Sequence, residues 1–275
     1  MSLCDKCQGR AIIYQKYSGM HLCSSHFEED VHRKVRESLR RTKLFGRGAR
    51  VAFGLSGGNS SSTLLYILKN LFGCRKDIDF WAVIIYEEEE SHSQLVQAIK
   101  LAEKLEIPYV VKKTPTMDNV LPTDASSMHC ILSNLKMELL NNAAQEMGAD
   151  ILATGHSLDD ESTAIFIDYL RGDVEALFRS WACQEIPGKI PWIKPLRRIP
   201  AKEVRLYAIN HGLYSPENEE YIFAKTIHDV VKRHLSSFDS RHPGTKYSLL
   251  AGMERVMSMR DEAAVGAKPL SEDAK

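Results

Sequence analysis

Arg50-Val51-Ala52-Phe53-Gly54-Leu55-Ser56-Gly57-Gly58-Asn59-Ser60-Ser61-Ser62 is the stretch that decides the fold. An apolar run leads into two adjacent glycines and a series of hydroxyl and amide side chains, and residues 63–68 continue as one apolar face. This order predicts a buried strand, a tight glycine turn and the first turn of a helix.

A turn of this kind is a site for an anion. Glycine lets a ligand approach the backbone, the first N–H groups of a helix have no partner within it, and the helix dipole is positive at that end. Phosphate is the anion that such turns most often bind. We expect a phosphate to contact the residues of this turn: Gly54, Ser56, Gly57, Gly58, Asn59, Ser60 and Ser61. The alternative is an ordinary surface turn rich in glycine and serine.

Composition narrows the class of protein. The chain has 275 residues, enough for one large domain or for one domain with a small module. Its 36 basic and 36 acidic residues balance, so any contact with nucleic acid must be a local patch. We expect a cytoplasmic protein, because the sequence shows neither a membrane-spanning apolar run nor a signal-peptide core after Met1. Its six cysteines therefore favour metal binding or chemistry over disulfides.

The first residues have the spacing of a metal site. Cys4-x-x-Cys7 is followed after fifteen residues by Cys23-x-x-His26. Three thiolates and one imidazole suit tetrahedral zinc, and four protein ligands leave no open position, so the predicted role is structural. The alternative is a set of unrelated free thiols.

A basic segment follows this predicted zinc module. Residues 27–41 have a helical pattern with Val31, Val35 and Leu39 on one face. The segment and the residues after it carry many cations: Arg33, Lys34, Arg36, Arg40, Arg41, Lys43, Arg47 and Arg50. Such a run is either a solvated helix face or a contact for the backbone of RNA.

Short apolar strands alternate with helices, with strands expected at 79–86, 108–111 and 151–154 and helices at 91–105, 130–147 and after 155–161. This alternation predicts an α/β fold with a doubly wound parallel sheet, in which ligands bind at the carboxyl ends of the strands. The turn at 56–62 and the segment at 155–160 both lie at such ends, so we expect them to face one pocket.

The later chain reads as helices at 200–210, 221–235 and 247–257 with a polar tail. We expect five regions: a zinc module at 1–27, a basic linker at 28–49, an α/β domain at 50–215, C-terminal helices at 216–260 and a flexible tail at 261–275.

Several motifs resemble one family. Residues 56–61 resemble the S-G-G-x-D-S loop of PP-loop ATP pyrophosphatases, and residues 153–161 resemble their A-T-G-H-N-x-D-D segment. Residues 170–173 and 193–204 narrow the resemblance further. Together with the zinc module, they resemble the tRNA 2-thiolation branch, of the TtcA and TtuA type, over roughly residues 1–257.

The resemblance implies a reaction and its partners. ATP binds at the glycine loop with Mg²⁺, a carbonyl of a tRNA base attacks the α-phosphate, pyrophosphate leaves, and a sulfur donor displaces AMP. The implied partners are tRNA and a sulfur carrier protein or sulfurtransferase, and the resemblance is compatible with a homodimer. No membrane partner is expected.

The resemblance also assigns roles. Asp159 and Asp160 hold Mg²⁺ directly or through water. The same motifs imply that three further residues bind the nucleotide and that one arginine is catalytic. The nucleotide-binding residues are Gly155, His156 and Lys194, and the catalytic candidate is Arg197. Each role has a structural alternative, since the two aspartates suit helix capping, the arginine a surface position, and the histidine a hydrogen-bonded core position.

Two departures from the family pattern bear on the chemistry. The family loop has an aspartate where this chain has Ser60, and a neutral hydroxyl binds Mg²⁺ less well than a carboxylate. The family also has C-x-x-C before the helix at 130–147 and a third cysteine later, whereas this chain has Cys130 alone there and none at 215–221. We therefore expect no family-type iron–sulfur cluster, with Cys130 as the catalytic thiol or an external sulfur carrier in its place. Cys183 reads better as a small buried hydrophobe.

Three functions fit these observations. The first is an ATP-dependent enzyme that adenylates a tRNA base for 2-thiolation. The second is a degenerate, non-catalytic subunit that supports tRNA binding by an active partner. The third is an enzyme that adenylates a small molecule, because fold alone does not fix the substrate.

Overall fold

The structure of the protein is a computed structural model. It describes residues 2–42, 45–86, 92–114, 125–179, 181, 188–216 and 226–266, with the backbone alone at 92, 125–133, 179 and 263–266.

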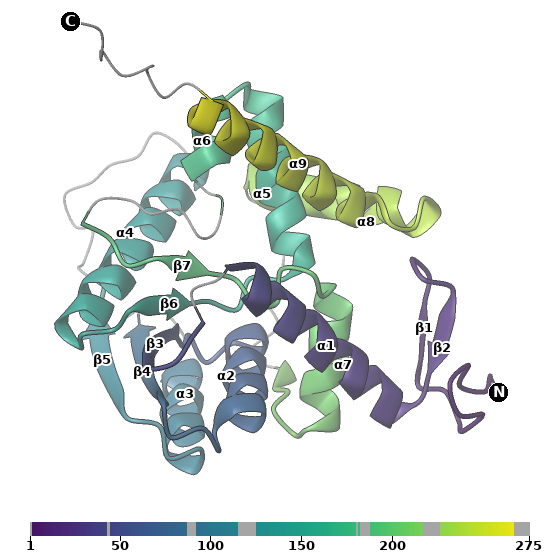
Figure 1. Ribbon diagram of the computed structural model, residues 1–275, viewed down its shortest axis with the longest axis horizontal. Coiled ribbons are helices and arrows are strands. Elements are labelled where there is room, and N and C mark those ends of the chain that lie inside the picture. Colours follow the sequence, from purple (N-terminus) through teal and green to yellow (C-terminus); the bar gives the residue numbers. More distant parts are fainter. Residues whose placement is uncertain are drawn as a thin grey trace, which may run out of the picture.

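One parallel sheet forms the centre of the molecule (Figure 1). Within the described residues its strands are β5 (Tyr109–Lys113), β4 (Ile78–Tyr86), β3 (Ala49–Gly54), β6 (Ile151–Ala153) and β7 (Trp192–Ile193), in that spatial order. All four pairings are parallel. The α/β fold and its parallel sheet are therefore confirmed.

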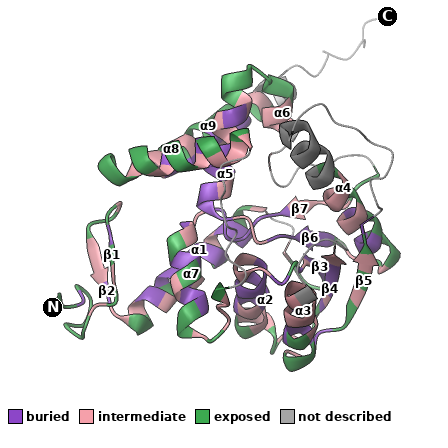
Figure 2. Cartoon of the chain, turned by 180° about the vertical axis from the view of Figure 1, so that it is seen from behind, coloured by how far each residue is buried: buried purple, intermediate pink, exposed green. Residues whose placement is uncertain are grey.

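Helices cover both faces of the sheet. Val51 and Phe53 of β3 point into the larger core, where side chains of four helices meet them. These helices are α1 (Ser24–Thr42), α2 (Asn59–Phe72), α3 (His92–Lys104) and α7 (Ala201–Asn210). Ala52, between them, points to the other face and packs with Ala143 and Ala144 of α4 (Ala125–Glu146). The buried residues in Figure 2 follow this layered arrangement.

A small module lies outside the layers, at the N-terminal end of α1 (Figure 1). It contains an antiparallel hairpin of β1 (Ile13–Gln15) and β2 (Met20–Leu22), together with the turn that carries the first two cysteines. Ile13 and Met20 pack against the main core, so the module is continuous with the domain.

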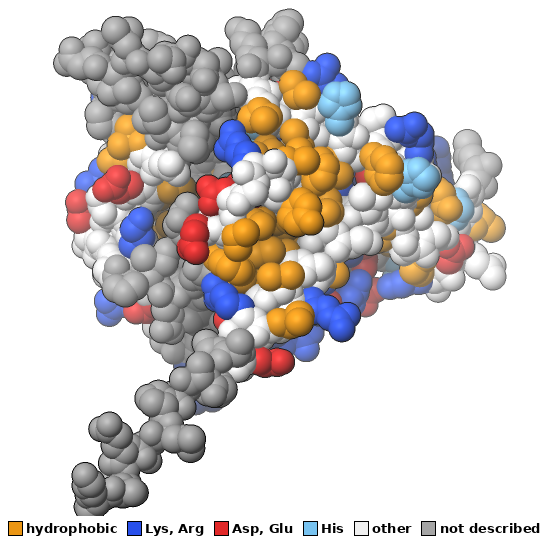
Figure 3. Space-filling view, turned by 90° about the horizontal axis from the view of Figure 1, so that it is seen from above, with side chains coloured by type: hydrophobic (Ala, Val, Ile, Leu, Met, Phe, Trp, Pro, Cys, Tyr) orange, Lys and Arg blue, Asp and Glu red, His pale blue; other side chains and the backbone are white. Residues whose placement is uncertain are grey.

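The C-terminal helices stand beyond the carboxyl edge of the sheet. They are α5 (Leu158–Arg171), α6 (Val174–Arg179), α8 (Ile227–Arg241) and α9 (Thr245–Gly266). Figure 3 shows hydrophobic side chains gathered over this end of the molecule. Helix α9 continues well past residue 257, where the sequence pattern ended the predicted helix. None of the helices in the described residues is both long and apolar enough to cross a membrane.

The basic helix α1 is less available to RNA than its sequence indicates. Lys34 is buried, and its ammonium lies 2.8 Å from Asp30 Oδ2 and 3.1 Å from Glu203 Oε2. Lys34 therefore fits neither of the two alternatives for the basic run, a solvated helix face or an RNA contact. Arg41 pairs with Glu37 at 3.0 Å, and Arg36 and Arg40 are exposed on the same helix.

Candidate functional site

The glycine turn joins the end of β3 to the start of α2. Gly57 has φ +78°, and a Cβ atom there would lie 2.0 Å from the carbonyl oxygen of Gln94, so only glycine fits. The serines of the turn hold it together. Ser61 Oγ donates to the carbonyl oxygen of Gly58 at 3.1 Å and lies 3.1 Å from Ser56 Oγ. A Cβ atom on Gly58 would approach only Ser56 Oγ, at 3.3 Å, so the space beyond this glycine is open.

Gly155 brings the two predicted segments into contact. A Cβ atom at this position would lie 2.8 Å from the carbonyl carbon of Ser60 and 2.8 Å from the backbone nitrogen of Ser61. The chain after β6 therefore touches the backbone of the first turn of α2, at the carboxyl ends of neighbouring strands. That position is where α/β sheets bind ligands.

Two residues of the turn have evident structural contacts. Gly54 faces α4, where an added Cβ atom would lie 3.1 Å from Leu140 Cδ1. Asn59 fixes a distant loop, because its Oδ1 accepts from the Ser215 N–H at 3.1 Å and its Nδ2 donates to the Ser215 carbonyl at 3.4 Å. Ser60, the neutral substitute for the family aspartate, is half-buried at the contact with Gly155.

The start of α5 is a capping box. Asp160 Oδ2 accepts from the backbone N–H of Ser157 at 2.8 Å and from its hydroxyl at 2.7 Å. The other oxygen, Oδ1, accepts from Lys232 of α8 at 2.9 Å. Burial alone would raise the pKa of the Asp160 carboxyl, but the charge of Lys232 and the hydrogen bonds from Lys232 and Ser157 outweigh it and hold that pKa well below its usual range. The capping role noted from the sequence is present in the structure.

Asp159 is enclosed on both sides. Its Oδ2 accepts from the backbone N–H of Ala201 at 2.7 Å. Its Oδ1 pairs with Lys246 of α9, which also donates to Ser236 at 2.9 Å. Both oxygens of this buried carboxylate are therefore engaged by the protein itself.

Glu161 completes a run of three paired carboxylates. It is buried, and it accepts from Lys194 at 2.5 Å and lies 3.4 Å from Arg197. Lys194 also lies 4.1 Å from the centroid of the Trp192 ring. The two predicted cations are thus positioned together by one glutamate, next to the segment that touches the glycine turn.

His156 is held as a neutral side chain. Its Nδ1 lies 2.8 Å from the hydroxyl of Thr154, and its ring meets Trp192 edge to face at 5.4 Å. Burial, and then the positive charge of Lys194, lower the pKa of His156 below its ordinary value. At pH 7 the imidazole is therefore a hydrogen-bonding group and carries no charge.

The structure adds residues that the sequence motifs did not assign a role. Lys232 and Lys246 lie in segments that carry none of the family motifs, and Trp192 precedes the cationic segment at 193–198. No local signal connects them to α5. The predicted thiol Cys130 and the alternative Cys183 have side chains outside the described residues.

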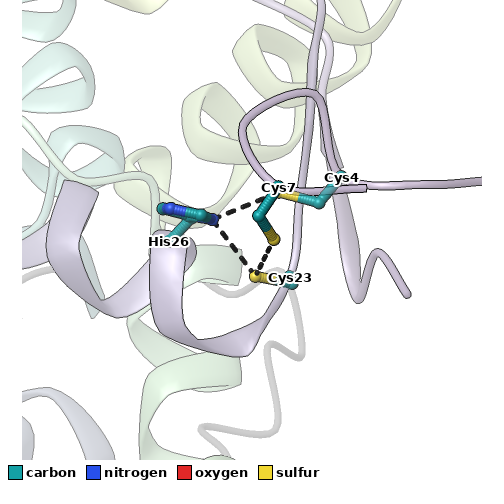
Figure 4. Close-up of side chains that lie close together, drawn as sticks. All are labelled: Cys4, Cys7, Cys23 and His26. Carbon is teal, nitrogen blue, oxygen red and sulfur yellow. Dashed lines mark hydrogen bonds between the residues drawn. The ribbon is translucent and has the colours of Figure 1, made fainter. Parts of the chain in front are cut away.

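The N-terminal module brings its four predicted ligands together (Figure 4). The three thiol sulfurs and one imidazole nitrogen of Cys4, Cys7, Cys23 and His26 lie within 4.8 Å of one another. Cys4 and Cys23 each lie close to His26 Nδ1, at 3.4 and 3.3 Å. The first pair comes from a turn before the hairpin, whereas Cys23 lies between β2 and α1 and His26 in the first turn of α1.

One thiol of the module, that of Cys4, already favours the thiolate form, whereas the neighbouring sulfurs of Cys23 and Cys4 raise the pKa of Cys7. Burial would raise the pKa of the Cys4 thiol, but N–H groups of Cys23, Lys6 and Cys7 and the ring of His26 together lower it to about 6. A deprotonated sulfur is the form that binds metal. Three sulfurs and one nitrogen are a donor set for zinc, so the residues fit the expected metal.

The fold and the two turns define a nucleotide-binding protein of the PP-loop class. Residues 27–220 match the family model described as the PP-loop domain, and residues 3–28 match the N-terminal LIM domain of the 2-thiouridine synthetase TtuA. The chain belongs to the tRNA 2-thiolation family of PP-loop ATP pyrophosphatases, as the motifs predict.

Individual relatives support this assignment. The chain is 32% identical to the tRNA 2-thiolation protein NcsA of Haloferax volcanii, over 93% of this chain and 87% of the relative. It is 27% identical to the cytoplasmic tRNA 2-thiolation protein 1 of Caenorhabditis elegans, over 91% and 70%. The structure of the U34-tRNA thiolase NcsA from Methanococcus maripaludis, with its [4Fe-4S] cluster, superposes with a TM-score of 0.82 at 29% identity, over 94% of this chain and 89% of that one.

The metal site leads to a first prediction. The purified protein will contain about one zinc per chain, since three thiols and one imidazole would fill the four positions of a structural zinc site. Elemental analysis of the Cys4→Ser, Cys7→Ser double variant will show that this zinc is lost. Cys74→Ser is the matched control, because Cys74 is an exposed free cysteine outside the module. Full zinc content in the double variant would contradict the assignment.

The glycine turn leads to a second prediction. Gly58→Val will abolish ATP binding, because its added methyl groups fill the open space next to the turn. Isothermal titration calorimetry measures the affinity. Gly46→Val provides the control, since Gly46 also has open space around it but lies outside the turn. Wild-type affinity in Gly58→Val would place the nucleotide elsewhere.

Proposed function

We propose that this protein is a cytoplasmic ATP-dependent enzyme that adenylates a base of tRNA and replaces the activated oxygen with sulfur. In the first step a carbonyl oxygen of the base bonds to the α-phosphorus of ATP and pyrophosphate leaves. In the second, a sulfur donor attacks the activated carbon and AMP leaves with the oxygen. Membership of the 2-thiolation family supports this reaction class.

The observation that carries the proposal is the contact made by Gly155. It brings Gly155, the residue before His156, against the first turn of α2, and the cations paired with Glu161 are held at the start of the helix that follows. The N-terminal end of that helix offers backbone N–H groups and a positive dipole end to the phosphates of ATP. The cations Lys194 and Arg197 lie on the neighbouring strand segment, where they suit the charge that develops at the α-phosphate.

The two aspartates divide their roles in this proposal. Asp159 anchors the C-terminal helices, because Ala201 and Lys246 occupy both of its oxygens. Asp160 uses one oxygen for the helix cap, and the other is paired with Lys232. It is therefore the carboxylate that can bind a nucleotide-bound Mg²⁺, by exchanging Lys232 for the ion or through water. Mg²⁺ would supply charge neutralisation of the phosphates.

The cysteines do not fit a cluster of the family type. Three of the six lie in the metal module. Cys74 follows the end of α2, a helix of 14 residues that is therefore about 21 Å long. Because α2 starts at the glycine turn, Cys74 lies at the opposite end of the sheet from that turn. Only Cys130 and Cys183 remain, fewer than the three thiolates of the family pattern. We therefore propose an external sulfur carrier or sulfurtransferase as the donor. Where that donor is a persulfide, Cys130 is the family-position thiol that takes over its terminal sulfur, and the donor leaves as a thiol.

This cysteine count gives a third prediction. Protein purified without oxygen, or treated with iron and sulfide, will contain less iron and acid-labile sulfide per chain than one [4Fe-4S] cluster requires. Iron and sulfide assays measure this directly, independently of activity. Stoichiometric iron and sulfide that disappear in Cys130→Ser would show that the chain builds a cluster despite its reduced set of thiols.

The neutral side chain of Ser60, at the position of the family aspartate, favours a second function. Without the carboxylate at this position, the site has one fewer ligand for Mg²⁺. The chain would then act as a non-catalytic subunit that keeps the fold and the tRNA contacts and supports an active partner. The pyrophosphate-release assay distinguishes the two functions.

Restoring that carboxylate is the fourth prediction. If the chain is an enzyme, Ser60→Asp will lower the Mg²⁺ concentration needed for half-maximal pyrophosphate release by about tenfold, because an anionic oxygen favours a hard cation. The assay compares wild type, Ser60→Asp and the neutral control Ser60→Ala across a Mg²⁺ series, with tRNA present. Absence of turnover in every variant would leave the binding-subunit function for the isolated chain. Saturation of the wild type at low Mg²⁺ would show that Ser60 does not limit metal binding.

A further inference from the structure

The hairpin of the metal module has two unlike faces. Gln15 points inward, where it is 2% exposed and donates to Asp30 at 3.0 Å. Ile12, Tyr14 and Lys16 alternate with it and are exposed. The period of two is that of a strand with one buried face. The outward face is therefore a surface that the rest of the described chain leaves open.

Tyr14 is the centre of this outward face. It stands directly opposite His21 in the hairpin, and the two rings stack at 4.5 Å with an angle of 24° between their planes. Asp5 fixes the histidine strand, since its Oδ2 accepts from the His21 backbone N–H at 2.6 Å. One side of the tyrosine ring is thus supported, while the side chain keeps 47% of its surface exposed.

Cations accompany the exposed ring. Arg10 and Lys16 lie on either side of Tyr14 along the chain, both are exposed, and neither makes an ion pair with any residue that the structure describes. An exposed aromatic ring whose chain neighbours include unpaired cations is complementary to a base and its flanking phosphates. Tyr169 is also exposed, at 75%, but it lies on α5, outside the module.

We propose that Tyr14 is a stacking platform for an unpaired base of tRNA, with Arg10 and Lys16 contacting the phosphates beside that base. This inference rests on the proposed function, because tRNA is the occupant. A single-stranded segment fits better than a duplex, since only an unpaired base can place its face on the ring.

The platform positions the substrate and takes no part in the chemistry. The module lies outside the α/β layers, away from the start of α2 where the glycine turn ends (Figure 1). The stacked base is therefore a different one from the base that reacts. Loss of the platform is expected to raise the KM for tRNA and to leave kcat unchanged.

The test measures tRNA affinity by fluorescence anisotropy for wild type, Tyr14→Ala and Tyr14→Phe. We expect about tenfold weaker binding for Tyr14→Ala, and wild-type binding for Tyr14→Phe, which keeps the ring. Tyr169→Ala is the matched control and will bind as the wild type does. Zinc content and thermal unfolding of each variant show whether the module remains folded.

A second pair of changes tests the cations without removing the ring. In Arg10→Gln, Lys16→Gln the slope of log affinity against log salt will be smaller by about two, one for each lost phosphate contact. An unchanged slope would overturn the proposal, as would undiminished tRNA affinity in a zinc-loaded Tyr14→Ala variant. If the wild type binds tRNA and releases pyrophosphate while Tyr14→Ala has the same tRNA affinity, the stacking role of Tyr14 is wrong and the proposed function stands. If the wild type binds no tRNA, both the stacking role of Tyr14 and the proposed function are wrong.

Discussion

Three consecutive carboxylates at the start of α5 hold the carboxyl side of the molecule together. Asp159 pairs with Lys246 of α9, Asp160 with Lys232 of α8, and Glu161 with Lys194 after β7. Each of these acids is buried or largely so, and a buried charge is tolerated only with a close partner. Removing one member of such a pair costs about 3–5 kcal/mol, because the other is left uncompensated. The C-terminal helices are therefore part of the nucleotide site's support.

The metal module is attached by a second set of buried charges. Lys34 of α1 lies between Asp30 and Glu203, and Tyr17 of the hairpin donates to Glu203 at 2.8 Å. Tyr17 also packs on Tyr247 of α9, with ring centroids 4.7 Å apart. The hairpin, α1, α7 and α9 thus share one polar network. A substitution in the module that removes one of these partners also leaves a polar group of the C-terminal part of the chain unsatisfied, because the groups share one network.

The sequence predicts the local elements well and their partners poorly. The parallel sheet follows from apolar runs between helical patterns, and Gly155 and the glycine turn lie at strand ends, which meet in any sheet of this kind. No comparable rule predicts which lysine pairs with which carboxylate. Asp159 and its lysine are 87 residues apart, and Asp160 and Lys232 are 72 apart. Lys34 belongs to a run of cations that reads as a solvated face, and only the packing of α7 against α1 shows that it is buried.

The order of these partners along the chain has a consequence for biosynthesis. The ribosome makes α5 long before α8 and α9, so a nascent chain that ends near residue 226 has Asp159 and Asp160 but neither of their lysines. Two carboxylates that belong in the interior then have no countercharge, and water is a better environment for them than the core. The carboxyl side of the nucleotide site therefore reaches its final packing only after the last helix leaves the ribosome, and early termination of translation yields a chain with an unfinished site.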